Sequence, residues 1–290
     1  MRRAFDRGVT HFDLANNYGP PPGSAEENVG RILVEDFACH RDELIITTKA
    51  GHAMWNGPYG QGGSRKHLLA SLDQSLKRLR VNYVDLFYSH CPDPDTRLEE
   101  TMSALATAVH SGRALYVGLS KYPLKRLKKA VRILKEMGVR CLIYQAPYSI
   151  LNRWPEAEGI LDYLWDEKIG CEVFSPLAQG MLTPKYLDGI PEGSRAAREE
   201  GFLQVDQVLA EQEKIRALGD LAQSNGISLN HMALQWTLRS PAVTSSIIGA
   251  RTVAQLNDSL DALQAAAPDE SMLAAIDIIA PLQKKKHAEG

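Results

Sequence analysis

The sequence predicts an α/β fold, a (β/α)8 barrel of parallel strands with helices on the outside. Two observations predict it: short apolar runs rich in β-branched residues alternate with helical patterns, and polar residues stand at or near the ends of these runs. The runs cover residues 10–14, 44–49, 83–90, 114–120, 141–146, 171–176 and 245–250. Since the carboxyl ends of parallel barrel strands share one rim, these polar residues are expected to share a site.

Helices are predicted between the runs from their 3.6-residue apolar period and their end signals. One is expected to begin at Ser24, which forms an S-x-x-E capping box with Glu27, and another at Thr252, with Gln255. Residues 177–205 lack this periodicity and are rich in Gly, Pro and charge. This segment therefore indicates a functional loop over the sheet.

The predicted strands number seven, whereas the barrel needs eight. The chain opens inside a helical segment that ends at Gly8, so we expect the first strand of the barrel to be absent. A truncated or misassigned start and a protein that lacks this strand are both open. In either case residues 1–290 are expected to form one barrel domain, with 284–290 as a flexible, solvated tail.

Composition excludes several classes of function. The net charge is −2 and 44% of the residues are hydrophobic, so neither nucleic acid nor membrane is expected as a partner. No apolar run reaches the ~18 residues of a transmembrane helix. The four cysteines show no metal-ligand spacing, which favours reduced thiols in the cytoplasm and no metal site.

Four chemically useful side chains lie at the ends of the first three runs or just after them: Asp13, Tyr18, Lys49 and His90. Reduction of a carbonyl needs a hydride donor and an acid for the developing alkoxide. A tyrosine is a poor acid near neutral pH unless a cation lowers its pKa, which Lys49 could do while Asp13 holds it in place. His90 could polarise the carbonyl oxygen. Each residue alone has an ordinary structural interpretation, but together at neighbouring strand ends they favour catalysis.

With these residues in view, the sequence resembles the aldo-keto reductases, and within them the bacterial branch that is similar to potassium-channel β subunits. The resemblance covers nearly the whole chain. It rests on the stretches THFDLANNYGPPPGSAEENVGR, ELIITTKAG, YVDLFYSH, ALYVGLS, SPLAQGMLTPKYLDGIPEGSR and IIGARTVAQL. It implies a (β/α)8 barrel with an N-terminal hairpin and a glycine-ended first strand, and we expect both to be missing from residues 1–290. It also implies Asp13, Tyr18, Lys49 and His90 as the catalytic tetrad.

The resemblance further implies NADPH, bound in an extended form without a Rossmann fold. Ser120 and Gln145 would hold the nicotinamide carboxamide, with Tyr148 near the ring. The rest of the cofactor would meet Ser175, Pro176, Leu177, Gln179, Gly180, Lys185, Arg195, Gly249, Arg251, Gln255 and Asp258. For Lys185 and Arg195, a contact to the cofactor and simple exposure to solvent in the loop are almost equally weighted interpretations. Arg251, at a helix start, suits a 2′-phosphate and so favours NADPH over NADH.

Function follows as an expectation: NADPH-dependent reduction of small aldehydes, such as phosphorylated trioses or methylglyoxal. Trp55 and Tyr59 are candidates for one wall of the substrate pocket, with ordinary packing almost equally weighted, and Trp154 is a candidate for another wall. At the position after Ser120 the aldo-keto reductases usually have a small polar residue or Asn, whereas this sequence has Lys121. An NADPH-sensing regulatory subunit with little turnover and an inactive truncated form are the alternatives, and a homo-oligomer is open.

Overall fold

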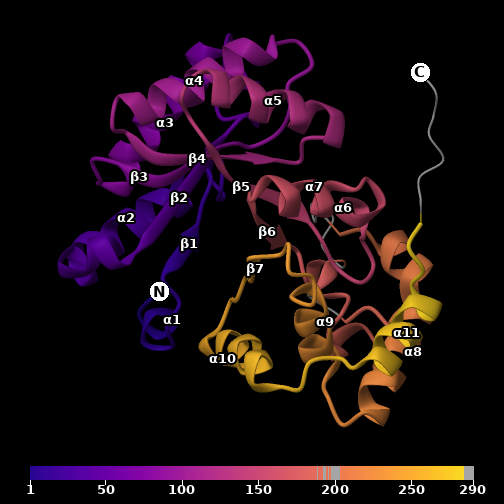
Figure 1. Cartoon of the computed structure of the whole chain (residues 1–290). Coiled ribbons are helices and arrows are strands. Elements are labelled where there is room, and N and C mark those ends of the chain that lie inside the picture. Colours follow the sequence, from indigo (N-terminus) through magenta and orange to yellow (C-terminus); the bar gives the residue numbers. More distant parts are fainter. Residues whose placement is uncertain (188, 192–193, 195, 197–202, 284–290) are drawn as a thin grey trace. The chain divides into compact units, whose positions relative to one another are not determined.

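The computed structural model describes residues 1–187, 189–191, 194, 196 and 203–283. The chain divides into two compact units, Met1–Gln145 and Ala146–Gly290. Strands and helices alternate in the first unit, and the second contains more helix (Figure 1).

The first unit repeats a strand followed by a helix. Its elements are α1 (Arg2–Asp6), β1 (His11–Asp13), α2 (Ser24–Asp36), the 3-10 segment η1 (Ala38–Glu43), β2 (Ile45–Ala50), α3 (Arg65–Leu79), β3 (Val84–Ser89), α4 (Leu98–His110), β4 (Ala114–Ser120), α5 (Leu124–Glu136) and β5 (Cys141–Pro147), which ends just past the unit boundary. The five strands pair in sequence order and all in parallel. This order brings the carboxyl ends of neighbouring strands to one edge of the sheet.

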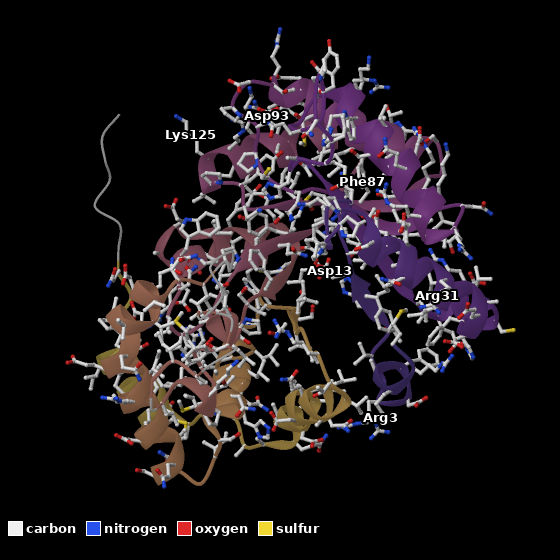
Figure 2. The ribbon with its side chains drawn as sticks, turned by 180° about the vertical axis from the view of Figure 1, so that it is seen from behind. Arg3, Asp13, Arg31, Phe87, Asp93 and Lys125 are labelled. Atoms are coloured by element: carbon white, nitrogen blue, oxygen red, sulfur yellow. The ribbon has the colours of Figure 1, made fainter. Side chains whose placement is uncertain are left out.

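The helices of the first unit cover the sheet because each has one apolar face. In α3, Leu68, Leu72 and Leu79 are fully buried, in agreement with the predicted helical period. Phe87 of β3 lies beneath such helices, whereas Lys125 of α5 reaches outward (Figure 2). The core therefore lies between the outer face of the sheet and the helices, which leaves the strand ends available for a site.

The second unit carries two parallel strands among helices. Its elements are α6 (Trp154–Ala157), α7 (Ile160–Glu167), β6 (Gly170–Phe174), the 3-10 segments η2 (Ala178–Gly180) and η3 (Pro184–Tyr186), α8 (Val205–Ser224), α9 (Leu229–Thr237), β7 (Ser245–Ile247), α10 (Val253–Asp261), η4 (Ala262–Gln264) and α11 (Glu270–Ile279). Strands β6 and β7 pair in parallel, with Val173 opposite Ser246. A long irregular segment between β6 and α8 contains only the two short 3-10 turns within its described residues, as its composition predicts.

The α/β class and the seven parallel strands are thus confirmed in the described part of the chain. The predicted start of α2 at Ser24 is confirmed, but the capping box predicted there is wrong. Helix α2 is capped by Gly23, in left-handed backbone, and Ser24 is already helical and makes no side-chain cap. The turn before it sets this start, because the Tyr18 carbonyl accepts from the Gly23 and Ala25 amides.

Further expectations concern a helix cap, the number of domains, the C-terminal tail and membrane-spanning helices. Of the capping box predicted at Thr252, one half is confirmed, since the Thr252 hydroxyl accepts from the Gln255 backbone amide at 3.2 Å, whereas the Gln255 side chain accepts from the Arg251 amide. The single barrel domain stays a prediction, and the expected tail at 284–290 lies outside the described residues. No helix in the described part of the chain has the length and apolar character that a membrane crossing requires.

Candidate active site

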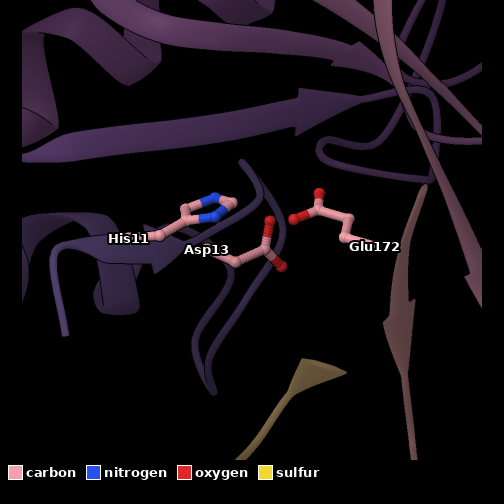
Figure 3. A group of neighbouring side chains, drawn as sticks. All are labelled: His11, Asp13 and Glu172. Carbon is pink, nitrogen blue, oxygen red and sulfur yellow. The ribbon is translucent and has the colours of Figure 1, made fainter. Parts of the chain in front are cut away.

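A buried ion pair joins the ends of β1 and β2. The Lys49 Nζ lies 2.6 Å from Asp13 Oδ2 and donates a second bond to the Leu14 carbonyl at 2.7 Å. Asp13 Oδ1 accepts from the Thr47 hydroxyl at 2.8 Å. Figure 3 shows Asp13 leaving β1 on the same side as His11, as residues two apart on a strand must. The pairing of β1 with β2 and the additional hydrogen bonds to Leu14 and Thr47 therefore fix the positions of the Asp13 and Lys49 side chains.

Tyr18 lies over this pair in the loop that follows β1. Its ring centre is 5.2 Å from Lys49 Nζ, and its side chain keeps partial exposure, at 36% for the residue. Backbone hydrogen bonds fix this loop at both ends. The Asn16 amide donates to the Lys49 carbonyl, and the Tyr18 carbonyl accepts from the Gly23 and Ala25 amides at the start of α2. A phenol with solvent access beside a buried ammonium is suited to proton transfer.

His90 completes the cluster from the residue after β3. Its ring makes an edge contact with Tyr18, with 5.9 Å between the ring centres, and its backbone amide donates to the Ala50 carbonyl at 2.9 Å. Burial, reinforced by the positive charges of Lys49 and Lys121, lowers the pKa of His90 to about 2. The imidazole is therefore neutral near pH 7 and can donate one N–H hydrogen bond.

The structure thus brings all four residues of the predicted tetrad together at one edge of the first unit. Two other predicted site residues lie beside them. The Gln145 amide donates to Asp13 Oδ1 at 3.2 Å. Ser120, which pairs in register with Gln145, is fully buried, and its hydroxyl has no hydrogen-bond partner in the described part of the chain. An unpartnered buried hydroxyl is costly and is typical of a group that awaits a ligand.

The remaining predicted cofactor residues lie in the second unit, apart from Arg195, which falls outside the described residues. After β6 the backbone of Ser175, Ala178, Gln179 and Gly180 has positive φ angles. Such left-handed conformations in non-glycine residues are strained and cluster at functional sites.

Around α10 two of the predicted residues are hydrogen-bonded to each other, and a third bonds to α9. The Gln255 side chain accepts from the Arg251 amide at 2.9 Å, which leaves the exposed Arg251 side chain at the helix start. Asp258 accepts from the Asn230 amide at 2.7 Å and lies 3.1 Å from the His231 ring. Gly249, which precedes these residues in the chain, is exposed. Lys185 lies in the irregular segment after β6, with its ammonium 5.6 Å from the Tyr186 ring centre.

The three residues proposed for the pocket walls have other neighbours. Trp55 packs on His67, with 4.9 Å between the ring centres, and exposed Tyr59 lies under the Lys66 ammonium. Trp154 begins α6 and lines a cavity of about 430 Å³ with residues of the second unit. Their role toward substrate stays a prediction.

Two residues near the tetrad were missed by sequence reasoning. Asn16 is fully buried, and neither polar atom of its side chain has a partner among the residues described. His52 packs against His90, with 4.4 Å between the ring centres. Asn16 could have been found from its place between Asp13 and Tyr18, since a polar side chain in that loop must face the site or solvent. His52 gave no such signal.

Comparison with known proteins agrees with this architecture. The model of the aldo/keto reductase family matches residues 1–281. This chain belongs to the aldo/keto reductase family, and it is an oxidoreductase.

Among its relatives is the L-glyceraldehyde 3-phosphate reductase of Escherichia coli K12, which is 55% identical over 96% of this chain and 81% of its own length. The putative voltage-gated potassium channel subunit beta of Schizosaccharomyces pombe is 32% identical, over 91% of this chain and 78% of its own. A probable subunit of the same kind from Oryza sativa is 33% identical, over 89% and 79% respectively. The predicted resemblance to reductases and channel β subunits is thereby confirmed.

Proposed function

We propose that this protein reduces small aldehydes to alcohols with NADPH as the hydride donor. The observation that carries the proposal is the buried Lys49–Asp13 pair, 2.6 Å apart, beneath the accessible ring of Tyr18. A charged ammonium held in that place favours the phenolate that remains after Tyr18 gives up its proton. A merely structural ion pair needs no phenol above it.

The roles of the tetrad follow from this geometry. NADPH, when bound, would supply the hydride that the carbonyl carbon accepts. Tyr18 gives its hydroxyl proton to the carbonyl oxygen, so that the aldehyde becomes an alcohol. Lys49 stabilises the resulting phenolate, Asp13 holds Lys49 in place, and neutral His90 donates a hydrogen bond that orients the carbonyl oxygen.

The residues present fit such a cofactor. The unpartnered hydroxyl of Ser120 and the amide of Gln145 are the hydrogen-bonding groups that a carboxamide requires. The left-handed backbone at Ser175, Ala178, Gln179 and Gly180 is strained in the manner of ligand-binding loops, which supports contacts to a pyrophosphate there. The exposed Arg251 supports NADPH over NADH, because a guanidinium is well matched to a phosphate.

A phosphorylated triose is the proposed substrate class, with methylglyoxal-like aldehydes as further substrates. Support comes from the Escherichia coli relative, whose name states reduction of L-glyceraldehyde 3-phosphate. The decisive experiment is steady-state oxidation of NADPH by the purified protein with glyceraldehyde 3-phosphate, glyceraldehyde and methylglyoxal. We expect many turnovers per protein molecule, and failure with every aldehyde would refute the proposal.

Similarity to the channel β subunits favours a second candidate function, a regulatory subunit that senses the redox state of its cofactor. A sensor would oxidise bound NADPH once, slowly, and then stop. The same assay, followed beyond one equivalent of NADPH, separates the two functions.

We also propose a reducing compartment such as the cytoplasm. The four cysteines are all free thiols, and Cys39 is exposed. Exposed thiols persist where glutathione and thioredoxin keep them reduced. Subcellular fractionation tests this point.

A further inference from the structure

A second group of basic side chains stands beside the tetrad. Lys121, the residue after β4, places its Nζ 2.7 Å from His52 Nε2. His52 in turn packs against His90. One imidazole ring therefore separates the Lys121 ammonium from the histidine of the tetrad.

The bond between Lys121 and His52 fixes the state of the histidine. An ammonium can only donate, so His52 Nε2 accepts and the ring proton sits on Nδ1, which faces Cys91 Sγ at 3.8 Å. Burial, assisted by the charge of Lys121, lowers the pKa of His52. The Lys121 ammonium therefore donates to a neutral His52 ring, which does not compensate the positive charge of Lys121.

No carboxylate pairs with Lys121 among the described residues. Burial lowers the pKa of Lys121, and the positive charge of Lys49 lowers it further. Asp93, which like Lys121 acts electrostatically on Cys91, already has its own hydrogen-bond donors. Its carboxylate accepts from the Gly63 amide at 2.6 Å and from the Thr96 hydroxyl at 2.7 Å. A half-buried ammonium without an anion is unfavourable and is relieved when a negatively charged ligand binds.

The backbone at Lys121 points to the same conclusion. Its φ angle is +61°, a conformation that non-glycine residues rarely adopt, and its amide donates to the Gln145 carbonyl at 3.1 Å. Strain of this kind persists where the surrounding structure requires it, often at ligand sites. Here it follows the end of β4, directly after Ser120.

Resting on the proposed aldehyde reduction, we propose that Lys121, supported by His52, binds the phosphate of a phosphorylated aldehyde while its carbonyl lies at Tyr18 and His90. A lysine is a common phosphate ligand that acts as a compact charge, and two of its three N–H groups remain for phosphate oxygens. Lys121 is then a residue that determines specificity, because it distinguishes a phosphorylated substrate from its neutral counterpart.

The test compares glyceraldehyde 3-phosphate with glyceraldehyde, which differ only in the phosphate, at saturating NADPH. The readout is the ratio of their kcat/KM values. In Lys121→Met we expect this ratio to fall by about 10- to 100-fold, the effect of losing one charged contact. Lys121→Arg, which keeps the charge, should retain most of the ratio. Lys125→Met removes an exposed lysine of α5 and should leave the ratio within about twofold.

Inorganic phosphate provides a second readout. It should compete with glyceraldehyde in the unmodified protein, with an inhibition constant that rises about tenfold or more in Lys121→Met. An unchanged substrate ratio in Lys121→Met, or an equal fall in Lys125→Met, would overturn the inference while glyceraldehyde turnover still supports the proposed function. Absence of turnover with both aldehydes in the unmodified protein would overturn the proposed function and this inference together.

Discussion

Lys49 Nζ and Asp13 Oδ2 lie 2.6 Å apart in the interior of the first unit, with Lys49 fully buried. Breaking such a pair by removing one partner leaves the other charge buried without compensation, which costs about 3–5 kcal/mol. We therefore expect Asp13→Asn to lower the free energy of unfolding by that amount and to reduce turnover. Urea denaturation and NADPH oxidation measure the two effects.

The double variant Asp13→Asn/Lys49→Met tests the cause. Since it removes both charges, it should recover part of the lost stability but none of the turnover. The exposed pair of Asp73 and Arg113 serves as control, and Asp73→Asn should cost at most about 1 kcal/mol. A double variant no more stable than Asp13→Asn would argue against an uncompensated charge.

His90 should make the protein sensitive to acid. In the folded state its pKa is about 2, because of burial and the nearby lysines, whereas the unfolded chain takes up a proton near the ordinary value of 6.5. The unfolded state thus binds more protons below pH 6.5, so stability is fully present above that pH and is lost as the pH falls. Between pH 7.5 and pH 5 this single group should cost about 2 kcal/mol.

His90→Gln should remove that part of the pH dependence, as measured by urea denaturation across the same range. His110→Gln, at the exposed end of α4, is the matched control and should leave the profile unchanged. Equal pH profiles for the unmodified protein and His90→Gln would contradict the account.

Much of this arrangement could be predicted from the sequence, and the reasons are physical. Strand ends in a parallel sheet share an edge, so Asp13, Lys49 and His90 could be brought together from the strand order alone. The helix start at Ser24 was predicted correctly, but its capping was not, because the backbone turn through Gly23, and not a Ser24 side chain, caps α2. His52 and the charge state of His90 depend on burial and on packing between loops, which no local pattern records.

Gly118 of β4 links packing to the site. A Cβ there would meet the Tyr88 ring at 2.3 Å, and that ring lies 5.6 Å from Lys49 Nζ. Gly118→Ala should displace this ring, which contacts Lys49, and so lower the free energy of unfolding by about 1–3 kcal/mol and reduce turnover. Thermal denaturation and the aldehyde assay measure both, and a neutral effect on stability would show that the ring can move without cost.

Arg251 should set the choice between the two nicotinamide cofactors. Without its guanidinium, Arg251→Ala should raise the KM for NADPH by about tenfold or more, since a charged contact to the 2′-phosphate is lost. The KM for NADH, which lacks that phosphate, is the internal control and should change little. Parallel increases for both cofactors would exclude a specific role in phosphate recognition.

The central claim is that Tyr18 donates the proton, and Tyr18→Phe tests it most directly because it removes only the hydroxyl. With glyceraldehyde 3-phosphate and NADPH, we expect kcat to fall by about 100-fold or more, the scale of general acid catalysis, while the Kd for NADPH changes less than about threefold. Turnover within a few-fold of the unmodified protein, with NADPH still bound, would contradict the account.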